Sequence, residues 1–218
     1  HLYQELHVNE KDEHFFALSF MLGAMDFLDI KSVLDVGSGT GRSLSYCKQK
    51  YSNIKVLGVE PVKELREIGY KNGLSEKELV NGNALNLDYA DYEFDLVCCF
   101  GLLHHIKEPD LAIAEMLRVS RKAIFISDAN NFGQGSLISR SCKQLLDYLK
   151  LWRIADWVKT GGKGYTLSDG DGLAYSYSVF SNFHQIEKQC KTTHLLNTKG
   201  GKINFYKTAS HVALLGIK

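Results

Sequence analysis

Two adjacent histidines and one aspartate are the side chains in this sequence whose positions suit acid–base chemistry. His104 and His105 come just after one apolar run, and Asp128 comes just after the next. Histidine titrates near neutral pH and is the side chain most often used as a general base. A neighbouring carboxylate fixes the imidazole tautomer and stabilises the protonated ring. These residue types predict a site of acid–base catalysis, with at least one of the two histidines as the base or its orienting partner.

A divalent metal site is the alternative interpretation of the same region. Asp128, Asn130 and Asn131 offer oxygen ligands close together in the sequence. Magnesium prefers such ligands, but the apolar run 94–100 leads to histidines and not to a carboxylate. We therefore predict that no metal is bound.

A glycine-rich turn is the second chemical feature. Gly37, Gly39 and Gly41 alternate with other residues directly after the apolar run 33–36, and Asp35 lies two residues before the first glycine. Glycine lets the backbone approach a ligand closely and adopt φ angles that a Cβ would forbid. A strand that ends in such a turn and continues as a helix forms a ligand crevice at the carboxyl end of a sheet.

A second carboxylate lies where the next strand is predicted to end. The run 55–59 is followed by Glu60 and Pro61. A carboxylate at this place suits ribose hydroxyls, whereas Asp35 suits a ligand that carries an amine. A dinucleotide-binding domain is the alternative, but its fingerprint spaces the glycines as G-x-G-x-x-G, unlike this turn.

Five segments in order resemble the motifs of class I S-adenosylmethionine-dependent methyltransferases. These segments are 33–42, 56–61, 81–85, 94–97 and 102–106. The resemblance implies a single α/β domain with a doubly wound, mostly parallel, seven-stranded Rossmann-like sheet. It also implies S-adenosylmethionine as the cofactor and S-adenosylhomocysteine as the product.

The resemblance assigns cofactor-binding roles residue by residue. Asp35 and the glycine turn correspond to the part that holds the methionine end, and Glu60 to the residue that holds the ribose. Asn83 stands where the family usually has Asp, and its amide offers adenine both an acceptor and a donor. A backbone carbonyl of Phe100 or Gly101 corresponds to the contact with the amino group. The implied set is Asp35, Gly37, Ser38, Gly39, Gly41, Glu60, Pro61, Asn83, Ala84, Leu85, Phe100 and Gly101.

Strand and helix patterns alternate along the first part of the chain, which predicts a parallel sheet with helices on both faces. The predicted strands are 33–36, 55–59, 79–80, 94–100 and 122–127, and the predicted helices are 42–50, 62–71 and 109–119. The runs 193–198 and 211–217 predict two closing strands. By resemblance these form an antiparallel hairpin with the last strand inserted into the sheet.

Two further segments flank this alternation. Residues 1–29 predict a cap helix that starts after Asn9, and we expect Tyr3 and His14 to be surface residues although both could approach the site. Residues 129–180 are predicted to be an insert with one or two amphipathic helices over 136–158, and related enzymes commonly have a substrate lid here. The alternation over 175–180 is typical of a strand.

The side chains of this insert leave several interpretations open. Its aromatic residues could line a sugar pocket or belong to the core: Trp152, Trp157, Tyr165, Tyr175 and Tyr177. Its basic residues Arg140, Lys143 and Arg153 could meet a phosphate, face solvent or contact a membrane surface.

The amino-acid composition indicates which partners and which cellular compartment suit the chain. The chain has 26 Lys and Arg against 25 Asp and Glu, so no net field attracts it to nucleic acid. Its five cysteines contain no C-x-x-C pair, which favours a reducing compartment. No signal-peptide pattern or long apolar run is present. We expect a cytoplasmic monomer or homodimer without stable membrane insertion.

The sequence thus predicts methyl transfer to a hydroxyl of a small molecule. The two histidines with Asp128 resemble the sugar O-methyltransferases of natural-product pathways, so a sugar or glycosylated metabolite is the first candidate acceptor. Methylation at nitrogen or carbon of a small molecule is the alternative within enzymes. A methyltransferase-like partner subunit without catalysis is the alternative outside them.

Overall fold

A seven-stranded sheet forms the centre of the computed structural model, which describes residues 12–169 and 172–218. The strand order is β3-β2-β1-β4-β5-β9-β8. The strands are β1 (Ser32–Val36), β2 (Lys55–Val59), β3 (Leu79–Val80), β4 (Phe94–Phe100), β5 (Ser120–Ala129), β8 (Thr192–Gly200) and β9 (Ala209–Ile217). The strands from β3 to β5 pair in parallel, and β9 pairs antiparallel with β5 and β8. The predicted doubly wound sheet with an inserted last strand is confirmed.

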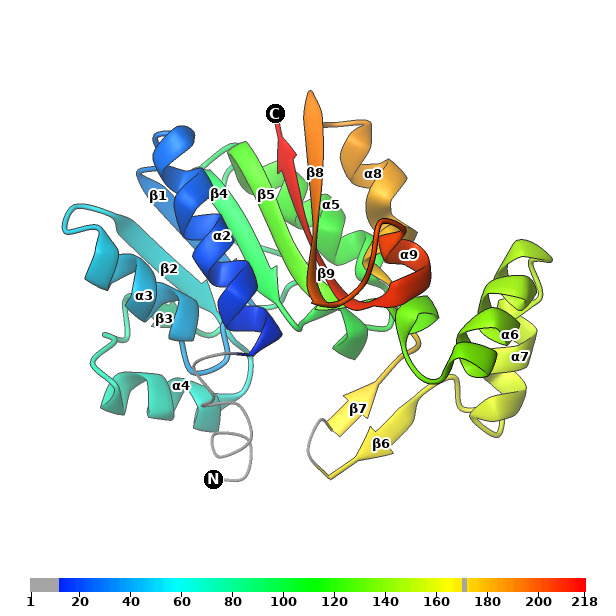
Figure 1. Ribbon diagram of the computed structural model, residues 1–218. Helices are drawn as coiled ribbons and strands as arrows, with labels where there is room; N and C mark the ends of the chain where they lie inside the picture. Colours follow the sequence, from blue (N-terminus) through cyan, green and yellow to red (C-terminus); the bar gives the residue numbers. More distant parts are fainter. Residues whose placement is uncertain (1–11, 170–171) are drawn as a thin grey trace.

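Helices cover both faces of this sheet (Figure 1). Helices α2 (Glu13–Phe27) and α3 (Arg42–Lys50) pack on one face, and α5 (Pro109–Val119) and α8 (Phe183–Glu187) on the other. Helix α4 (Lys63–Lys71) connects β2 to β3, and the short helix α9 (Phe205–Thr208) precedes β9. Successive strand side chains point to opposite faces, so a strand buried on both sides is apolar throughout.

Strand β4 shows this double burial. Cys98 belongs to the core beneath α2 and α3, and Cys99 to the core beneath α5 and α8. Burial raises the pKa of both thiols well above the ordinary value. These cysteines serve as small apolar side chains, as their place in a predicted core strand suggested.

The strand order reverses between β1 and β4, which are neighbours in the sheet although β2 and β3 lie between them in sequence. The chain leaves these two strands in opposite directions, and a crevice opens at their carboxyl ends. The glycine turn after β1 and the two histidines after β4 therefore meet at one edge of the sheet.

Helix α2 starts later than the predicted cap helix. Asp12 is its N-cap, and the Asp12 carboxylate accepts a hydrogen bond of 2.6 Å from the Phe15 backbone N–H. Asn9, the expected cap, and Tyr3 lie outside the described residues. Aspartate at the N-cap satisfies a backbone donor of the first turn that has no partner within the helix.

The segment after β5 contains two helices and a small hairpin. The helices are α6 (Leu137–Tyr148) and α7 (Trp152–Lys159), and the hairpin strands are β6 (Thr166–Ser168) and β7 (Gly172–Ala174). Both helices lie to one side of the sheet, away from the layers that cover it (Figure 1). No helix in the described part of the chain is both long and apolar enough to cross a bilayer.

The prediction of a strand over residues 175–180 is wrong. Tyr175 donates its backbone N–H to the His104 carbonyl, and the Tyr177 carbonyl accepts from the Asn131 N–H. The backbone groups thus pair with two different loops and not with one neighbouring strand. A 3₁₀ turn then begins at Val179.

Asn130 fastens the end of β5 to this segment and to β9. Its fully buried amide donates hydrogen bonds to the carbonyls of Ala209 (2.8 Å) and Tyr206 (2.9 Å), and its Oδ1 accepts one of 2.9 Å from the Ser178 hydroxyl. Asn130 was one of the possible metal ligands in the sequence. With these partners its side chain instead holds together the loops around the sheet edge.

We expect Asn130→Ala to lower the free energy of unfolding by about 3 kcal/mol, because it leaves buried carbonyl groups without donors. Urea denaturation would measure this difference. Asn53→Ala, at an exposed turn position, is the matched control and should change stability by less than about 0.5 kcal/mol. Equal stability of the two variants would contradict this role of Asn130.

Candidate active site

The glycine turn after β1 has the backbone conformation for which its sequence is suited. Gly37, Gly39 and Gly41 have φ angles of 70°, 56° and 75°. A Cβ added at Gly37 would collide with the Leu102 side chain, and one at Gly41 with Leu74. A Cβ added at Gly39 would meet no atom within 4 Å. The turn is therefore enclosed on both sides and open at its middle glycine.

Asp35 lies inside the turn. Its carboxylate is 3% exposed and accepts hydrogen bonds from the hydroxyls of Ser38, at 2.9 Å, and Ser43. Burial raises the pKa of Asp35 to about 6, although both hydroxyls act in the opposite direction. Asp35 and Ser38 thus order the turn and the start of α3, and their contact with a ligand stays a prediction.

Glu60 closes the other side of the turn. It follows β2 directly and is buried, and its carboxylate accepts hydrogen bonds of 2.9 Å from the backbone N–H groups of Gly39 and Val62. The carboxylate therefore lies next to the open glycine. This is the position that suits a ligand with vicinal hydroxyls.

His104 and Asp128 form a pair at the carboxyl ends of β4 and β5. His104 Nδ1 lies 2.6 Å from Asp128 Oδ1. The carboxylate also accepts the backbone N–H groups of Leu103 (2.7 Å) and Ala129 (2.6 Å). Burial raises the pKa of Asp128, but the hydrogen bond and charge of His104 and the two N–H donors outweigh burial and hold this pKa below its ordinary value. The ionised carboxylate keeps the proton on Nδ1, so Nε2 carries the lone pair of the neutral ring.

His105 contacts a different partner. Its Nδ1 lies 2.6 Å from the Leu173 carbonyl, so this nitrogen is the donor and His105 holds the β6–β7 hairpin. The rings of His104 and His105 lie with their centroids 3.9 Å apart and their planes tilted by 44°. Of the two histidines, His104 lines the cavity described next.

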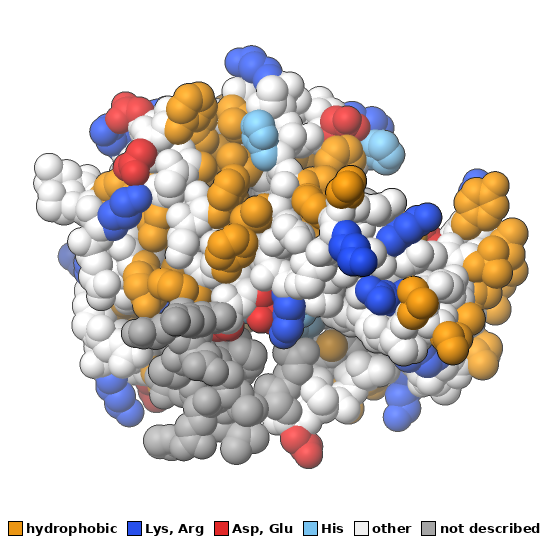
Figure 2. Space-filling view, in the orientation of Figure 1, with side chains coloured by type: hydrophobic (Ala, Val, Ile, Leu, Met, Phe, Trp, Pro, Cys, Tyr) orange, Lys and Arg blue, Asp and Glu red, His pale blue; other side chains and the backbone are white. Residues whose placement is uncertain are grey.

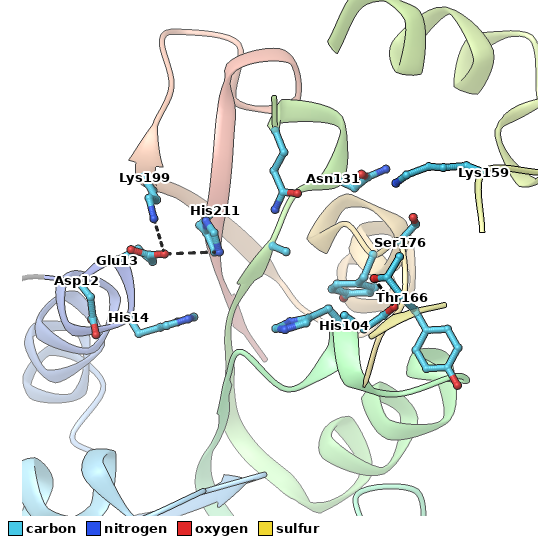
Figure 3. Close-up of a pocket in the computed structure, with 15 residues that line it drawn as sticks. Asp12, Glu13, His14, His104, Asn131, Lys159, Thr166, Ser176, Lys199 and His211 are labelled. Carbon is cyan, nitrogen blue, oxygen red and sulfur yellow. Dashed lines mark hydrogen bonds and ion pairs between the residues drawn. The ribbon is translucent and has the colours of Figure 1, made fainter. Parts of the chain in front are cut away.

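A cavity of about 520 Å³ lies beside the His104–Asp128 pair. Its lining includes His14, His104, Asn131, Gln134, Lys159, Tyr175, Ser176, Tyr177 and His211. The rings of His14 and His104 point toward one another across it (Figure 3). A Cβ added at Gly101 would lie 3.3 Å from His14 and 3.8 Å from His104, so both rings flank the end of β4. His14 thus belongs to the site, although a surface position was expected.

A second polar cluster borders the same cavity. Glu13 accepts a hydrogen bond of 2.9 Å from Lys199, and its carboxylate lies 3.6 Å from His211 Nε2. Burial lowers the pKa of both His14 and His211, because the charged imidazolium is poorly solvated there. The neutral forms of these rings can accept or donate a hydrogen bond to a polar ligand.

Sequence reasoning did not single out Glu13, Lys199 or His211. The antiparallel insertion of β9 places His211 opposite Ala129, one residue beyond Asp128. The sequence predicted this insertion, so an alignment of β9 against β5 could have identified His211 as a residue of the site. Glu13 and Lys199 depend on how α2 packs, for which the sequence held no comparable signal.

A methyltransferase-domain sequence profile matches residues 34–125. Two curated relatives match part of the chain. Norajmaline N-methyltransferase of Rauvolfia serpentina is 36% identical over 95 residues, which are 41% of this chain and 32% of that protein. Phosphatidylethanolamine N-methyltransferase of Cereibacter sphaeroides is 30% identical over 118 residues, 47% of this chain and 51% of that protein. The chain thus spans about half or less of the length of these relatives.

Solved structures of similar fold cover nearly the whole chain. An S-adenosylmethionine-dependent methyltransferase from Mesorhizobium loti has a TM-score of 0.63 and 12% identity, covering 96% of this chain and 99% of that one. The YcgJ protein from Bacillus subtilis has a TM-score of 0.59 and 15% identity, covering 94% and 99%.

Residues 34–125 match a methyltransferase domain, and the chain has the fold of class I S-adenosylmethionine-dependent methyltransferases. The sequence motifs that resemble this family fall within the matched profile or beside it. The predicted cofactor is therefore the one that belongs to this kind of domain.

The residues of the methyltransferase domain fit S-adenosylmethionine. The turn is open at Gly39, and the carboxylate of Glu60, the residue predicted to hold the ribose, lies beside it. Asn83 is exposed in the loop after β3, and its Oδ1 accepts a hydrogen bond of 3.0 Å from Leu85. Ala84 and Leu85 are half-buried next to it.

The other predicted contacts lie around the same edge. Phe100 ends β4, Gly101 donates its N–H to the Ser127 carbonyl at 2.8 Å, and Pro61 is exposed after Glu60. Their contacts with the cofactor, like those of Asn83 and Ala84, stay predictions.

The raised pKa of Asp35 predicts a pH-dependent stability. The folded chain binds the proton more tightly than the unfolded chain, so this contribution is complete below pH 3.8 and is lost as pH rises through about 6. Over that interval the wild type should lose about 3 kcal/mol relative to Asp35→Asn, which has no proton to release. Urea denaturation of both chains at pH 4 and pH 7, without cofactor, measures the difference. A pH-independent difference would contradict the shift.

Glu60→Ala should weaken binding of S-adenosylmethionine about tenfold or more, because hydrogen bonds to a charged group contribute about 1.5–3 kcal/mol each. Titration calorimetry measures the affinity, with S-adenosylhomocysteine and NAD as further ligands. Glu64→Ala, at an exposed position in the first turn of α4, is the control and should bind like the wild type. Binding of NAD alone would contradict the cofactor assignment, and no binding of any ligand would favour an inactive partner subunit.

Proposed function

We propose that this chain transfers the methyl group of S-adenosylmethionine to a hydroxyl of a small polar molecule, with His104 as the general base. The His104–Asp128 pair at the cavity is the observation that carries this proposal. A hydroxyl must lose its proton as it attacks, whereas a neutral amine can attack with its lone pair. A half-buried base with an orienting carboxylate therefore favours a hydroxyl acceptor.

Bound S-adenosylmethionine supplies an electrophilic methyl group on a sulfonium. The cavity residues would hold the acceptor, and His104 Nε2 would take the proton from its hydroxyl as that oxygen receives the methyl group. Asp128 stabilises the imidazolium that results. Holding the reactants in line can itself supply several kcal/mol of the barrier reduction.

The cavity lining supports a hydroxylated acceptor. Asn131, Gln134, Lys159, Ser176 and His211 are polar, and the volume of about 520 Å³ accommodates a sugar unit with an attached group. A sugar or a glycosylated metabolite is accordingly the acceptor class that we propose.

Residues 129–180 form the lid of this proposed site. Thr166, Ala174, Tyr175 and Ser176 line the cavity from the β6–β7 hairpin and the segment after it. His105 holds that hairpin through the Leu173 carbonyl. The lid excludes water from the reacting groups, which strengthens electrostatic interactions among them.

Methylation of a small-molecule amine is the second candidate. The names of the two curated relatives, which act at nitrogen, favour it. In that reaction the amine attacks first and releases its proton afterwards, so His104 matters less for the rate.

His104→Ala should lower kcat/KM for a hydroxyl acceptor by about 10²–10⁴, the usual contribution of a general base, without changing the affinity for S-adenosylmethionine. Transfer of radiolabelled methyl groups to a panel of sugars, glycosides and amines measures the rate. His184→Ala is the matched control, because His184 is an exposed histidine of α8 that does not line the cavity. An amine substrate that His104→Ala methylates at the wild-type rate would support the second candidate and contradict the first.

A further inference from the structure

Helices α6 and α7 carry a large share of the exposed apolar side chains. Of the eighteen large hydrophobic residues exposed in the described part of the chain, nine lie in these two helices and the short links at their ends. Tyr148 is 83% exposed, Ile154 62% and Trp157 60%. Neither helix has a buried residue. We call residues 137–163, which include both helices and the turn that follows, the α6–α7 hairpin.

The hairpin turns its polar side toward the protein. Gln144 donates hydrogen bonds to the carbonyls of Phe132 (3.0 Å) and Lys207 (3.1 Å), and Asp147 accepts one from the Tyr206 hydroxyl. In α7, Asp156 accepts a hydrogen bond from Ser176. The usual orientation of an amphipathic helix on a globular protein is the reverse, with the apolar side buried.

The apolar side consequently faces outward. Figure 2 shows hydrophobic side chains gathered along the outer edge of the hairpin, at the right of the view. The positions Ile138, Leu145 and Leu149 in and after α6, and Ile154 and Trp157 in α7, repeat with helical spacing. A contiguous exposed patch of this kind marks an interaction site.

The charges around the patch are of one sign. The hairpin has six basic and two acidic residues, and both acids are hydrogen-bonded toward the protein. Its exposed charged side chains are all cations: Lys150, Arg153, Lys159 and Lys163. The patch therefore complements a surface that is apolar inside and negatively charged outside.

We propose that the α6–α7 hairpin docks on the surface of a membrane that contains anionic lipids. Its apolar side chains enter the boundary between headgroups and acyl chains, while the exposed cations Lys150, Arg153 and Lys163 contact lipid phosphates. Trp157 suits this boundary because an indole ring has an apolar body and a polar N–H. Lys159 also lines the cavity, so docking brings the cavity next to the lipid surface.

A second copy of the chain suits this patch less well. A two-fold contact places the same surface of both copies together, so it would bring the cations of both copies, Lys150 and Arg153 among them, into one interface. Repulsion between these cations opposes such pairing, whereas anionic lipid attracts both.

Vesicle sedimentation tests the docking with the full 218-residue chain. We expect binding to vesicles of phosphatidylcholine mixed with phosphatidylglycerol, with weaker binding to phosphatidylcholine alone and at high salt. The variant Ile154→Glu/Trp157→Glu should bind about tenfold less tightly or worse, because it removes two buried apolar groups. Lys150→Glu/Arg153→Glu should lose the preference for phosphatidylglycerol.

Ile203→Glu is the matched control, because Ile203 is a fully exposed apolar residue outside the hairpin. It should bind vesicles like the wild type. All these positions are exposed, so the thermal midpoints of the variants should equal that of the wild type. Trp152→Phe leaves Trp157 as the single tryptophan, and its fluorescence should shift to shorter wavelength when vesicles are added.

Three results would overturn the proposal. The wild type could remain in the supernatant with every vesicle, or Ile203→Glu could weaken binding as much as the hairpin variant. Light scattering could instead find a stable dimer that Ile154→Glu/Trp157→Glu dissociates, which would assign the patch to a second copy. None of these measurements depends on the methyl acceptor.

Discussion

The buried carboxylate of Asp128 is the interaction on which the proposed acceptor site depends. A charge in the protein interior is tolerated where hydrogen bonds replace the lost water. Its partners are the N–H groups of Leu103 and Ala129 and the ring of His104. One carboxylate thereby joins the loop after β4 to the end of β5 and orients the histidine. Removing it would disturb the loop as well as the ring.

Two other carboxylates order the cofactor side in a related way. Asp35 accepts hydrogen bonds from the hydroxyls of Ser38 and Ser43, and Glu60 accepts them from two backbone N–H groups. The strands β1, β2, β4 and β5 end at one edge of the sheet. An acid at or near three of these ends accepts hydrogen bonds from the loops at this edge. The environments differ, because burial dominates at Asp35 and donors dominate at Asp128. The first pKa is consequently raised and the second lowered.

The α6–α7 hairpin follows another rule. Most helices here bury an apolar side in one of the two cores. This hairpin attaches to the protein through hydrogen bonds and the contact of Trp152 with Phe132, and it leaves most of its apolar side chains outward. Burial of that side would contribute stability only in contact with something else. The hairpin also adjoins the cavity through Lys159, so a surface that contacts the hairpin lies close to the cavity.

The sequence by itself determined the order of the sheet elements, the glycine turn and the polar residues that follow each strand. These features are local, since hydrophobic periodicity and turn residues act over a few positions. Helix 109–119 and strand 94–100 were predicted to the residue. Tertiary structure decided which of the two histidines lines the cavity, because His104 pairs with Asp128 whereas His105 pairs with the Leu173 carbonyl. It also brought His14 and His211 into the site and turned the apolar side of the hairpin outward, since packing between distant segments controls both.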